Sequence, residues 1–421
     1  MNILWLCNIP LPIISAHMGK PNECLGGWMT GILNEMKNKK DIRLTVVFPT
    51  LGENIICGEV DGIQYYGFPE KIAKPYLYDY SVELYLDQII KKVKPDIVHI
   101  FGTEFPHALA MTKIFNKPKK TIINIQGLCS IIEKHYYANL PQNIVNRYTF
   151  RDLVKRDNIK TQRRKFKKRG AFELEAIKNV DNVIGRTEWD KACTYQINPD
   201  CKYYECNEIL RDEFYKYEWD INRCQKHSIF MSQGTYPIKG LHFMIEAMNQ
   251  VVKLYPDAHL YIAGNDITAD KTLKDKLKVS SYSKYIKELI YKYDLKKHIT
   301  FTGNLDEKSM CKRFLDSHVF VSASSIENES NSMSEAKILG VPVIGSYVGG
   351  TTGRIDHGIE GYQYQFDAPY MLAHYIDNIF KDDEKAISFS NESRKRALII
   401  NDKKANFENM LEIYQRIYNT K

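Results

Sequence analysis

No run of apolar residues in this 421-residue chain reaches the ~20 residues that a membrane-spanning helix requires. The first ten residues, MNILWLCNIP, carry neither a basic start nor a small-residue cleavage site. We therefore expect a first buried strand here and not a signal peptide. Together these absences predict a cytoplasmic protein, whose contact with a membrane, if it has one, is peripheral and at the inner face.

The nine cysteines are scattered along the chain and include no Cys-x-x-Cys motif. No pair of histidines stands near them at a metal-binding spacing. This pattern excludes a disulfide framework and a structural zinc site as working hypotheses, and it fits a reducing compartment. We expect no metal site and no bound cofactor.

Three fingerprints of common nucleotide-binding and hydrolytic enzymes are missing. The chain has no G-x-G-x-x-G after its first apolar segment, no G-x-x-x-x-G-K-[ST] and no G-x-S-x-G. Their absence argues against a dinucleotide oxidoreductase, a P-loop NTPase and an α/β-hydrolase.

Positive charge is concentrated in one segment. Residues 151–170 hold ten Lys and Arg against Asp152 and Asp157, so ten minus two equals the net charge of +8 of the whole chain. Two interpretations stay open, a solvated helix face and a surface for an anionic partner such as a membrane or a lipid diphosphate. Nucleic acid is not expected, because Phe166 is the one aromatic residue among these charges and stacking usually needs more.

Apolar segments typical of buried strands alternate with helical patterns along the chain, which predicts two α/β domains with parallel sheets covered on both faces. A tyrosine-rich stretch, residues 203–219, is predicted as an irregular linker, and the tail from Ile387 is predicted to be helical. The expected strands are Asn2–Leu6, Leu44–Phe48, Ile97–Phe101, Thr121–Ile125, Asn182–Ile184, Ser228–Ser232, His259–Ala263, Ile299–Thr302, Val319–Val321 and Pro342–Gly345.

Two glutamates, Glu327 and Glu335, flank a short polar run that leads into a helical pattern. The first N–H groups of a helix have no internal partner and carry partial positive charge, so such a start can hold phosphate. Two carboxylates beside it can grip a polyhydroxylated ligand. Ser332 and Glu335 also fit a capping box, in which Glu335 would merely satisfy the helix start.

The order of these residues is similar to that of the family 4 glycosyltransferases, retaining enzymes of the GT-B fold that use nucleotide sugars. Glu327 and Glu335 match the E-x7-E motif of that family. Residues 336–344 resemble its EAMACGKPVI continuation, residues 348–350 its VGG, and residues 357–361 its DGxxG turn. The string as a whole is specific, although E-x7-E alone is not.

The resemblance implies a GT-B fold, in which two Rossmann-like domains face each other across a cleft and a C-terminal helix packs back toward the N-terminal domain. The implied division is an acceptor-side domain (1–215), a nucleotide-sugar-binding domain (216–385) and a returning helical segment (386–421). The implied activity is retaining transfer of a sugar from a UDP- or GDP-linked donor to a hydroxyl of a glycan or lipid-linked acceptor, in cell-surface polysaccharide synthesis.

The resemblance also implies roles for single residues. Lys239, in a loop similar to the GRLxxxKG loop of the family, would neutralise the donor diphosphate as a compact charge. Glu327 would orient the donor sugar, and Glu335 would hold the ribose. Further donor contacts are expected at Gly26, Gly27, Gly234, Leu305, Ser330, Asn331, Ser332 and Met333.

The chain departs from the family pattern at two positions. An arginine expected near Gly234 is missing, and Gln126 stands where a histidine usually contacts the donor sugar. A glutamine can hydrogen-bond a hydroxyl but cannot act as an acid or base. Glu104 is a second expected sugar or acceptor contact. Glu329 is expected to point to solvent, because its charge would repel a diphosphate.

These departures keep other hypotheses open. One is a non-catalytic subunit of the same fold that binds a glycan or a nucleotide. Another is an epimerase of the GT-B fold, which would need additional acid and base residues that the chain does not clearly show. A phosphorylase would need a cofactor-binding lysine context that the sequence also lacks.

Overall fold

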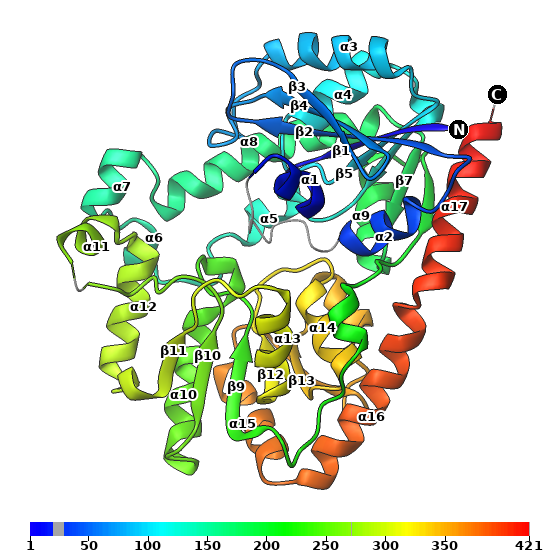
Figure 1. Cartoon of the computed structure of the whole chain (residues 1–421). Helices are drawn as coiled ribbons and strands as arrows, with labels where there is room; N and C mark the ends of the chain where they lie inside the picture. The colour runs from blue at the N-terminus through cyan, green and yellow to red at the C-terminus, as the bar shows by residue number, and fades with distance from the viewer. Residues whose placement is uncertain (20–28, 271, 421) are drawn as a thin grey trace. The chain divides into compact units, whose positions relative to one another are not determined.

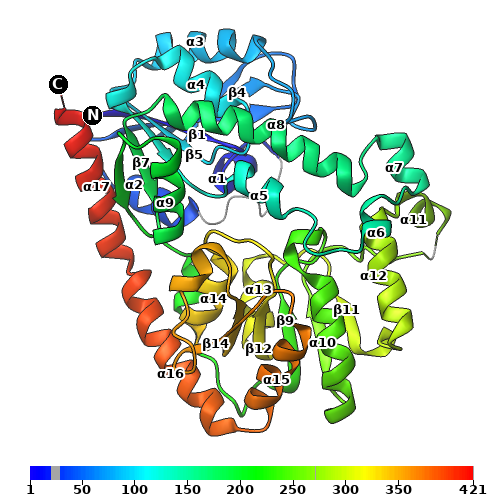
Figure 2. The ribbon, with the colours of Figure 1, turned by 180° about the vertical axis from the view of Figure 1, so that it is seen from behind.

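The computed structural model describes residues 1–19, 29–270 and 272–420, and its contacts divide the chain into two compact units (Figures 1 and 2). Unit 1 comprises Met1–Glu133, Lys165–Arg211 and Asn401–Lys421, and unit 2 comprises Lys134–Arg164 and Asp212–Ile400. This division differs from the predicted bounds in two respects. Residues 134–164 group with the second sheet, although they lie within the first half of the sequence. Of the predicted returning segment 386–421, residues 386–400 group with unit 2 and only the rest with unit 1.

The sheet of unit 1 has eight strands in the order β3-β4-β2-β1-β5-β6-β7-β8, and all neighbours are parallel except β3 and β4. Parallel neighbours follow from helices that cross over between strands. The strands are β1 (Asn2–Cys7), β2 (Arg43–Thr50), β3 (Ile56–Val60), β4 (Ile63–Pro69), β5 (Ile97–Phe101), β6 (Thr121–Asn124), β7 (Asn182–Gly185) and β8 (Lys202–Glu205).

The core of unit 1 lies on both faces of this sheet, and β1 shows why. Its odd residues, Ile3 and Trp5, belong to one buried cluster, whereas its even residues, Leu4 and Leu6, belong to another. Side chains alternate between the faces of a strand, so a strand covered on both sides must be apolar throughout. This confirms, for the sheet of unit 1, the expectation of coverage on both faces.

Helices supply both coverings. The helices of the chain are α1 (Pro12–His17), α2 (Thr30–Met36), α3 (Ser81–Val93), α4 (His107–Phe115), α5 (Cys129–His135), α6 (Gln142–Val145), α7 (Phe150–Lys155), α8 (Ile159–Lys178), α9 (Glu188–Ile197), α10 (Leu241–Leu254), α11 (Leu273–Lys278), α12 (Ser281–Lys292), α13 (Glu307–Leu315), α14 (Asn331–Leu339), α15 (Pro369–Phe380), α16 (Asp383–Ile400) and α17 (Lys403–Asn419).

The last helix, α17, packs on the sheet of unit 1, as predicted for a returning C-terminal helix. The hydroxyl of Tyr414 accepts a hydrogen bond of 2.9 Å from the indole N–H of Trp5 and lies 2.7 Å from Nδ1 of His99. Burial lowers the pKa of His99 to about 3, so its ring is neutral and can accept from the tyrosine hydroxyl. One hydroxyl thus joins α17 to β1 and β5.

We expect Tyr414→Phe to destabilise the protein by about 2 kcal/mol, because it leaves the buried indole N–H of Trp5 without an acceptor. Urea unfolding of the variant measures the loss. Tyr418→Phe on the same helix is the control, since Tyr418 is partly exposed and its loss should be nearly neutral. Equal stabilities of the two variants would contradict a role for the Trp5–Tyr414–His99 contact.

Unit 2 holds a sheet of six parallel strands in the order β11-β10-β9-β12-β13-β14. Its first strand in the sequence, β9, lies at the centre, so the chain winds from β9 outward in both directions. The strands are β9 (Gln225–Met231), β10 (His259–Ile262), β11 (Ile299–Phe301), β12 (Ser317–Ser322), β13 (Val343–Ser346) and β14 (Gly361–Tyr364).

Each of the ten expected strands is present, with ends shifted by a few residues. Four observed strands were not expected: β3, β4, β8 and β14. The expectation of an irregular linker over residues 203–219 is wrong at its start, because Lys202–Glu205 pairs with β7 as an edge strand. The chain passes to unit 2 after Arg211.

Candidate functional site

The candidate site of unit 2 lies where the order of its sheet reverses. The chain leaves the carboxyl end of β9 toward one side of the sheet and reaches β12 on the other side. In an open α/β sheet, ligands bind in the crevice that such a reversal creates outside the carboxyl ends of the strands. Lys239 lies in the connection that follows β9, and Glu327 lies in the loop that follows β12.

The structure brings these two predicted residues together. Nζ of Lys239 donates a hydrogen bond of 2.6 Å to Oε2 of Glu327, which also accepts one of 3.2 Å from the Ser324 hydroxyl. Burial lowers the pKa of Lys239, but the attraction of Glu327 outweighs it and the net pKa is raised above its usual value. Lys239 is therefore fully charged at neutral pH.

A close backbone approach fixes this pair. Lys239 ends a 3-10 helix, Pro237–Lys239, and Gly240 follows it with a φ of +70°. A Cβ built on Gly240 would lie 1.8 Å from the carbonyl oxygen of Ala323, so only glycine fits. The amide of Ser325 donates to the carbonyl of Ile238 at 2.8 Å, which ties the two loops together.

A second glycine brings a third loop against Glu327. Gly349 has a φ of +50°, and a Cβ there would lie 2.1 Å from the carbonyl oxygen of Glu327. The amide of Gly350 donates to the same carbonyl at 3.1 Å. The Val348-Gly349-Gly350 sequence thus supports the backbone of Glu327.

Helix α14 begins beside this glutamate, but its cap is not the predicted one. The N-cap is Ser330, whose hydroxyl accepts from the amide of Met333 at 3.4 Å. Glu335 is therefore an interior helical residue, buried with 6% exposure, and does not complete a capping box with Ser332. Among the amides predicted to bind phosphate, that of Met333 is already in use, because it also donates to the carbonyl oxygen of Ser330 at 2.9 Å.

The prediction that Glu329 points to solvent is wrong. Its side chain is buried, its Oε2 lies 2.9 Å from the guanidinium of Arg354, and its Oε1 accepts from the Ser334 hydroxyl at 3.3 Å. A buried carboxylate requires such partners. The pairing also removes the repulsion that the sequence suggested, because Arg354 neutralises Glu329 beside the first turn of α14.

Arg354 is a functional candidate that sequence reasoning missed. The pair of Lys337 and Glu360, which contacts the backbone of Arg354, was missed as well. Lys337 is buried and donates to the carbonyl of Arg354 at 2.6 Å and to Glu360 at 2.9 Å. Burial lowers the pKa of Lys337 by more than the attraction of Glu360 raises it, so the net pKa is below its usual value. The spacing between these residues carries no local signal, since the partners come from different elements.

The loops that carry Gly234 and Leu305 lie at the same edge of the sheet. Gly234 is buried after β9, and Leu305 is half-buried after β11. Gly264 and Gly303 join the loops after β10 and β11, because each amide donates to the carbonyl of the other, at 2.9 and 3.1 Å. These predicted donor contacts therefore share the sheet edge of Lys239.

In unit 1, the predicted contacts Glu104 and Gln126 lie at the carboxyl edge of the sheet, where the strand order reverses at β1 and β5. Glu104 accepts from the amide of Gly127 and from the side chain of Asn8, both at 3.1 Å. The side-chain amide of Gln126 donates to Asn124 at 2.8 Å and to Glu208 at 3.0 Å.

Two buried contacts near these residues were not predicted. The guanidinium of Arg186, a residue that is 3% exposed, forms an ion pair of 2.9 Å with the Glu208 carboxylate that Gln126 also contacts. Nδ1 of His107 forms a hydrogen bond of 2.7 Å with Oε2 of Glu70. The predicted glycine pair Gly26 and Gly27 lies outside the described residues.

In the described part of the chain, no group of three or more His, Cys, Asp or Glu side chains is arranged to hold a metal ion. No helix there combines the length and apolarity that crossing a bilayer demands.

Residues 213–396 match the family model described as glycosyl transferases group 1. The spore coat protein SA of Bacillus subtilis (strain 168) is 26% identical over 188 residues, which cover 42% of this chain and 46% of that protein. The chain spans less than half the length of the first two curated relatives that it matches. These matches show a likeness to glycosyltransferases over part of the chain.

Solved structures extend the likeness to the whole chain. Sucrose-phosphate synthase from Thermosynechococcus elongatus aligns with a TM-score of 0.70 at 14% identity and covers 99% of both chains. Anabaena HepE in complex with UDP-glucose aligns with a TM-score of 0.68 at 15% identity and covers 99% of this chain and 100% of that one. The fold is GT-B. At these identities the likeness establishes the fold of this chain, and its activity must be argued from its own residues.

Proposed function

We propose that this protein is a retaining glycosyltransferase. It moves a sugar from a nucleoside diphosphate donor to a hydroxyl of a glycan or lipid-linked acceptor, in cell-surface polysaccharide synthesis at the cytoplasmic side of the membrane. The observation that carries the proposal is the 2.6 Å pair of Lys239 and Glu327 at the reversal point of the unit 2 sheet. The family match over residues 213–396 contains both residues.

The bond between the anomeric carbon and the diphosphate oxygen breaks, and its electrons leave with the diphosphate. The acceptor hydroxyl then bonds to the same face of that carbon, and its proton passes to the leaving phosphate oxygen. The protein must mainly stabilise negative charge on the leaving group. Lys239 would supply the positive charge that does so, together with the start of α14 at Asn331 and Ser332.

The remaining donor contacts are proposed from where their residues lie in unit 2. Glu327 would accept hydrogen bonds from the donor sugar once the diphosphate draws Lys239 away from it. Glu335 would hold the ribose, while Gly234 and Leu305 would lie against the base. The HepE structure contains UDP-glucose, which supports UDP as the nucleotide and leaves GDP as the alternative. We propose no cofactor besides the donor.

A non-catalytic nucleotide- or glycan-binding subunit is the second candidate. It is favoured by Gln126, whose side-chain amide is held by Asn124 and Glu208 where the family places a histidine. It is also favoured by the lack of a cation at Gly234.

Two measurements separate these candidates. Calorimetric titration with UDP and GDP is expected to show binding of one of them, and a panel of UDP- and GDP-sugars is expected to release free nucleoside diphosphate when a polyprenyl-linked or glycan acceptor is present. The anomeric configuration of the product, read by NMR, should match that of the donor. Binding without turnover of any donor would favour the non-catalytic subunit, and an inverted product would exclude the retaining mechanism.

A further inference from the structure

Helix α7 presents an apolar ridge to solvent. Phe150, Leu153 and Val154 are 62%, 62% and 68% exposed, and Tyr148 just before the helix is 54% exposed. Single exposed apolar residues are ordinary, but four large ones within seven positions form a patch that normally marks an interaction surface.

Positive charge borders this ridge. Lys155 and Arg156 end α7, Lys160 lies in the first turn of α8, and all three are exposed. Within the described residues, none of the three forms an ion pair with an acidic side chain. The acidic residues of the segment, Asp152 and Asp157, are turned instead toward Arg151.

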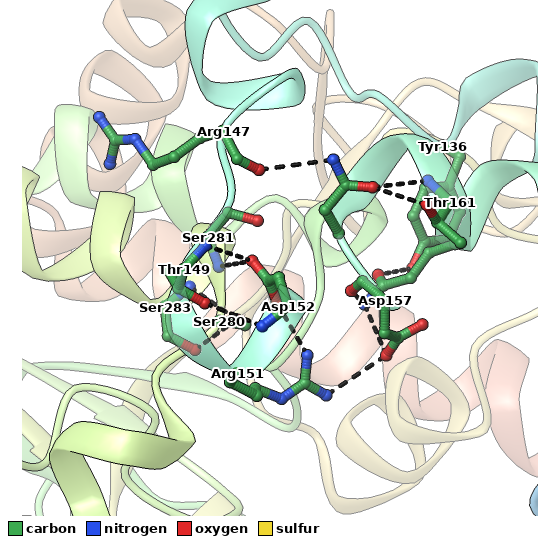
Figure 3. A network of polar contacts seen from close by, with 12 residues as sticks. Tyr136, Arg147, Thr149, Arg151, Asp152, Asp157, Thr161, Ser280, Ser281 and Ser283 are labelled. Atoms are coloured by element: carbon green, nitrogen blue, oxygen red, sulfur yellow. Dashed lines mark hydrogen bonds and ion pairs between the residues drawn. The ribbon is translucent and has the colours of Figure 1, made fainter. Parts of the chain in front are cut away.

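Hydrogen bonds and ion pairs hold the polar side of α7, as Figure 3 shows. Asp152 is fully buried, closes a capping box with Thr149 and accepts from the amide of Ser281 at the start of α12 at 2.9 Å. Arg151 spans Asp152 at 3.0 Å and Asp157 at 3.3 Å. The polar side of α7 therefore anchors the helix within unit 2, and its apolar side remains outside the anchoring contacts.

A neighbouring helix continues the same surface. Helix α11 contacts α7 and lies beside it in Figures 1 and 2. It exposes Leu277 at 48%, flanked by the exposed Lys276 and Lys278. Apolar and basic residues thus alternate over both helices, which we call the α7–α11 surface.

We propose that the α7–α11 surface docks the protein on an anionic lipid bilayer. Amphipathic surfaces that bind bilayers place apolar side chains at the acyl boundary and cations among anionic headgroups, and stable docking needs both. Charge complementarity selects this occupant over a second copy of the chain. A two-fold contact would place Lys155, Arg156 and Lys160 of one copy against their equals in the other. The docking does not depend on the proposed transferase activity.

Flotation of the full chain with vesicles tests the proposal. Vesicles of equimolar phosphatidylcholine and phosphatidylglycerol should carry the protein upward, vesicles of phosphatidylcholine alone should not, and added salt should weaken the binding because it screens the headgroup charge.

Two double variants dissect the surface. Lys155→Gln with Lys160→Gln should lower the partition coefficient on anionic vesicles about 30-fold, and Leu153→Ser with Val154→Ser should lower it about tenfold or more. The matched control is Lys253→Gln with Leu254→Ser, which changes an exposed lysine and an exposed leucine at the end of α10 in the same unit. Its partition coefficient should stay within about twofold of the parent value. Thermal unfolding confirms that each variant is folded.

Several results would overturn the proposal. Absence of flotation with anionic vesicles, equal flotation with neutral vesicles, or equal losses in the control and in both α7 variants would each do so. Sedimentation velocity provides one more test that could overturn it. A dimer of the parent chain that Leu153→Ser with Val154→Ser abolishes would show that the surface is a protein interface instead.

Discussion

Replacing Lys239 with alanine is expected to lower donor turnover by about 100- to 1000-fold, the loss typical of removing one preorganised group that stabilises developing negative charge. The ammonium is fully charged, because Glu327 raises its pKa against the effect of burial. The loss should appear mainly in kcat, since the diphosphate carries its full charge only as the bond to the sugar breaks. Release of nucleoside diphosphate in the presence of acceptor measures it.

Lys226→Ala is the matched control, since Lys226 is also paired with a carboxylate in unit 2. It lies 2.5 Å from Asp383, but both side chains are largely exposed. An exposed pair contributes about 1 kcal/mol or less, so the control should keep both its turnover and its stability. If Lys239→Ala kept the parent turnover in a folded protein, Lys239 would have no part in catalysis.

The pair also makes a coupling prediction within this experiment. Glu327→Gln alone removes the charge that holds Lys239, and Lys239→Ala alone leaves a half-buried carboxylate without its ion-pair partner. Residues in contact are not additive in their effects on stability, so the double variant should lose less free energy of unfolding than the sum of the two single losses. The losses of turnover should instead add as free energies, because the two residues would contact different groups of the bound donor.

The parallel sheets were predictable because burial on both faces leaves a strong signal. Ile3 to Leu6 is apolar without interruption, and such a run between helical patterns is typical of a strand covered on both faces. The β3–β4 hairpin was missed although its turn is visible in the sequence. Asp61 and Gly62 adopt φ values of +50° and +75°, as a two-residue hairpin turn requires, and Asp-Gly is the preferred pair there.

Edge strands left a weaker signal. In β8 the two end residues, Lys202 and Glu205, are exposed, and the tyrosines between them are half-buried. A short edge strand buries too little to show an apolar run, so a tyrosine-rich stretch could equally be irregular. Its pairing with β7 depends on where that strand lies, which local composition does not encode.

The candidate site, like the fold, was predictable only in part. The positions of Glu327, Glu335 and Lys239 followed from the resemblance, and the structure places Lys239 against Glu327. The partner of Glu329 did not follow, because Arg354 lies 25 positions away and only the fold brings it near. The helix cap was ambiguous for a different reason, since Ser330 and Ser332 are both good caps. The structure selects Ser330, and Met333 is buried in the first turn that follows it.

Gly240→Ala is the stability variant with the largest expected effect. The left-handed φ of +70° costs about 1–2 kcal/mol for a residue with a β-carbon. The added carbon would also meet the carbonyl oxygen of Ala323 at 1.8 Å, and backbone cannot rotate away as a side chain can. We expect a total loss of about 3 kcal/mol or more in the free energy of unfolding by urea.

Gly358→Ala separates strain from collision. Gly358 has a comparable φ of +81°, but a Cβ there would meet nothing within 4 Å. Its loss should therefore be only the conformational part, about 1 kcal/mol. Equal losses at the two glycines would show that the loops after β9 and β12 can separate freely. A larger loss at Gly240 would show that the close approach there holds Lys239 against Glu327. Gly240→Ala should then lower both donor turnover and stability, whereas Gly358→Ala should lower stability alone.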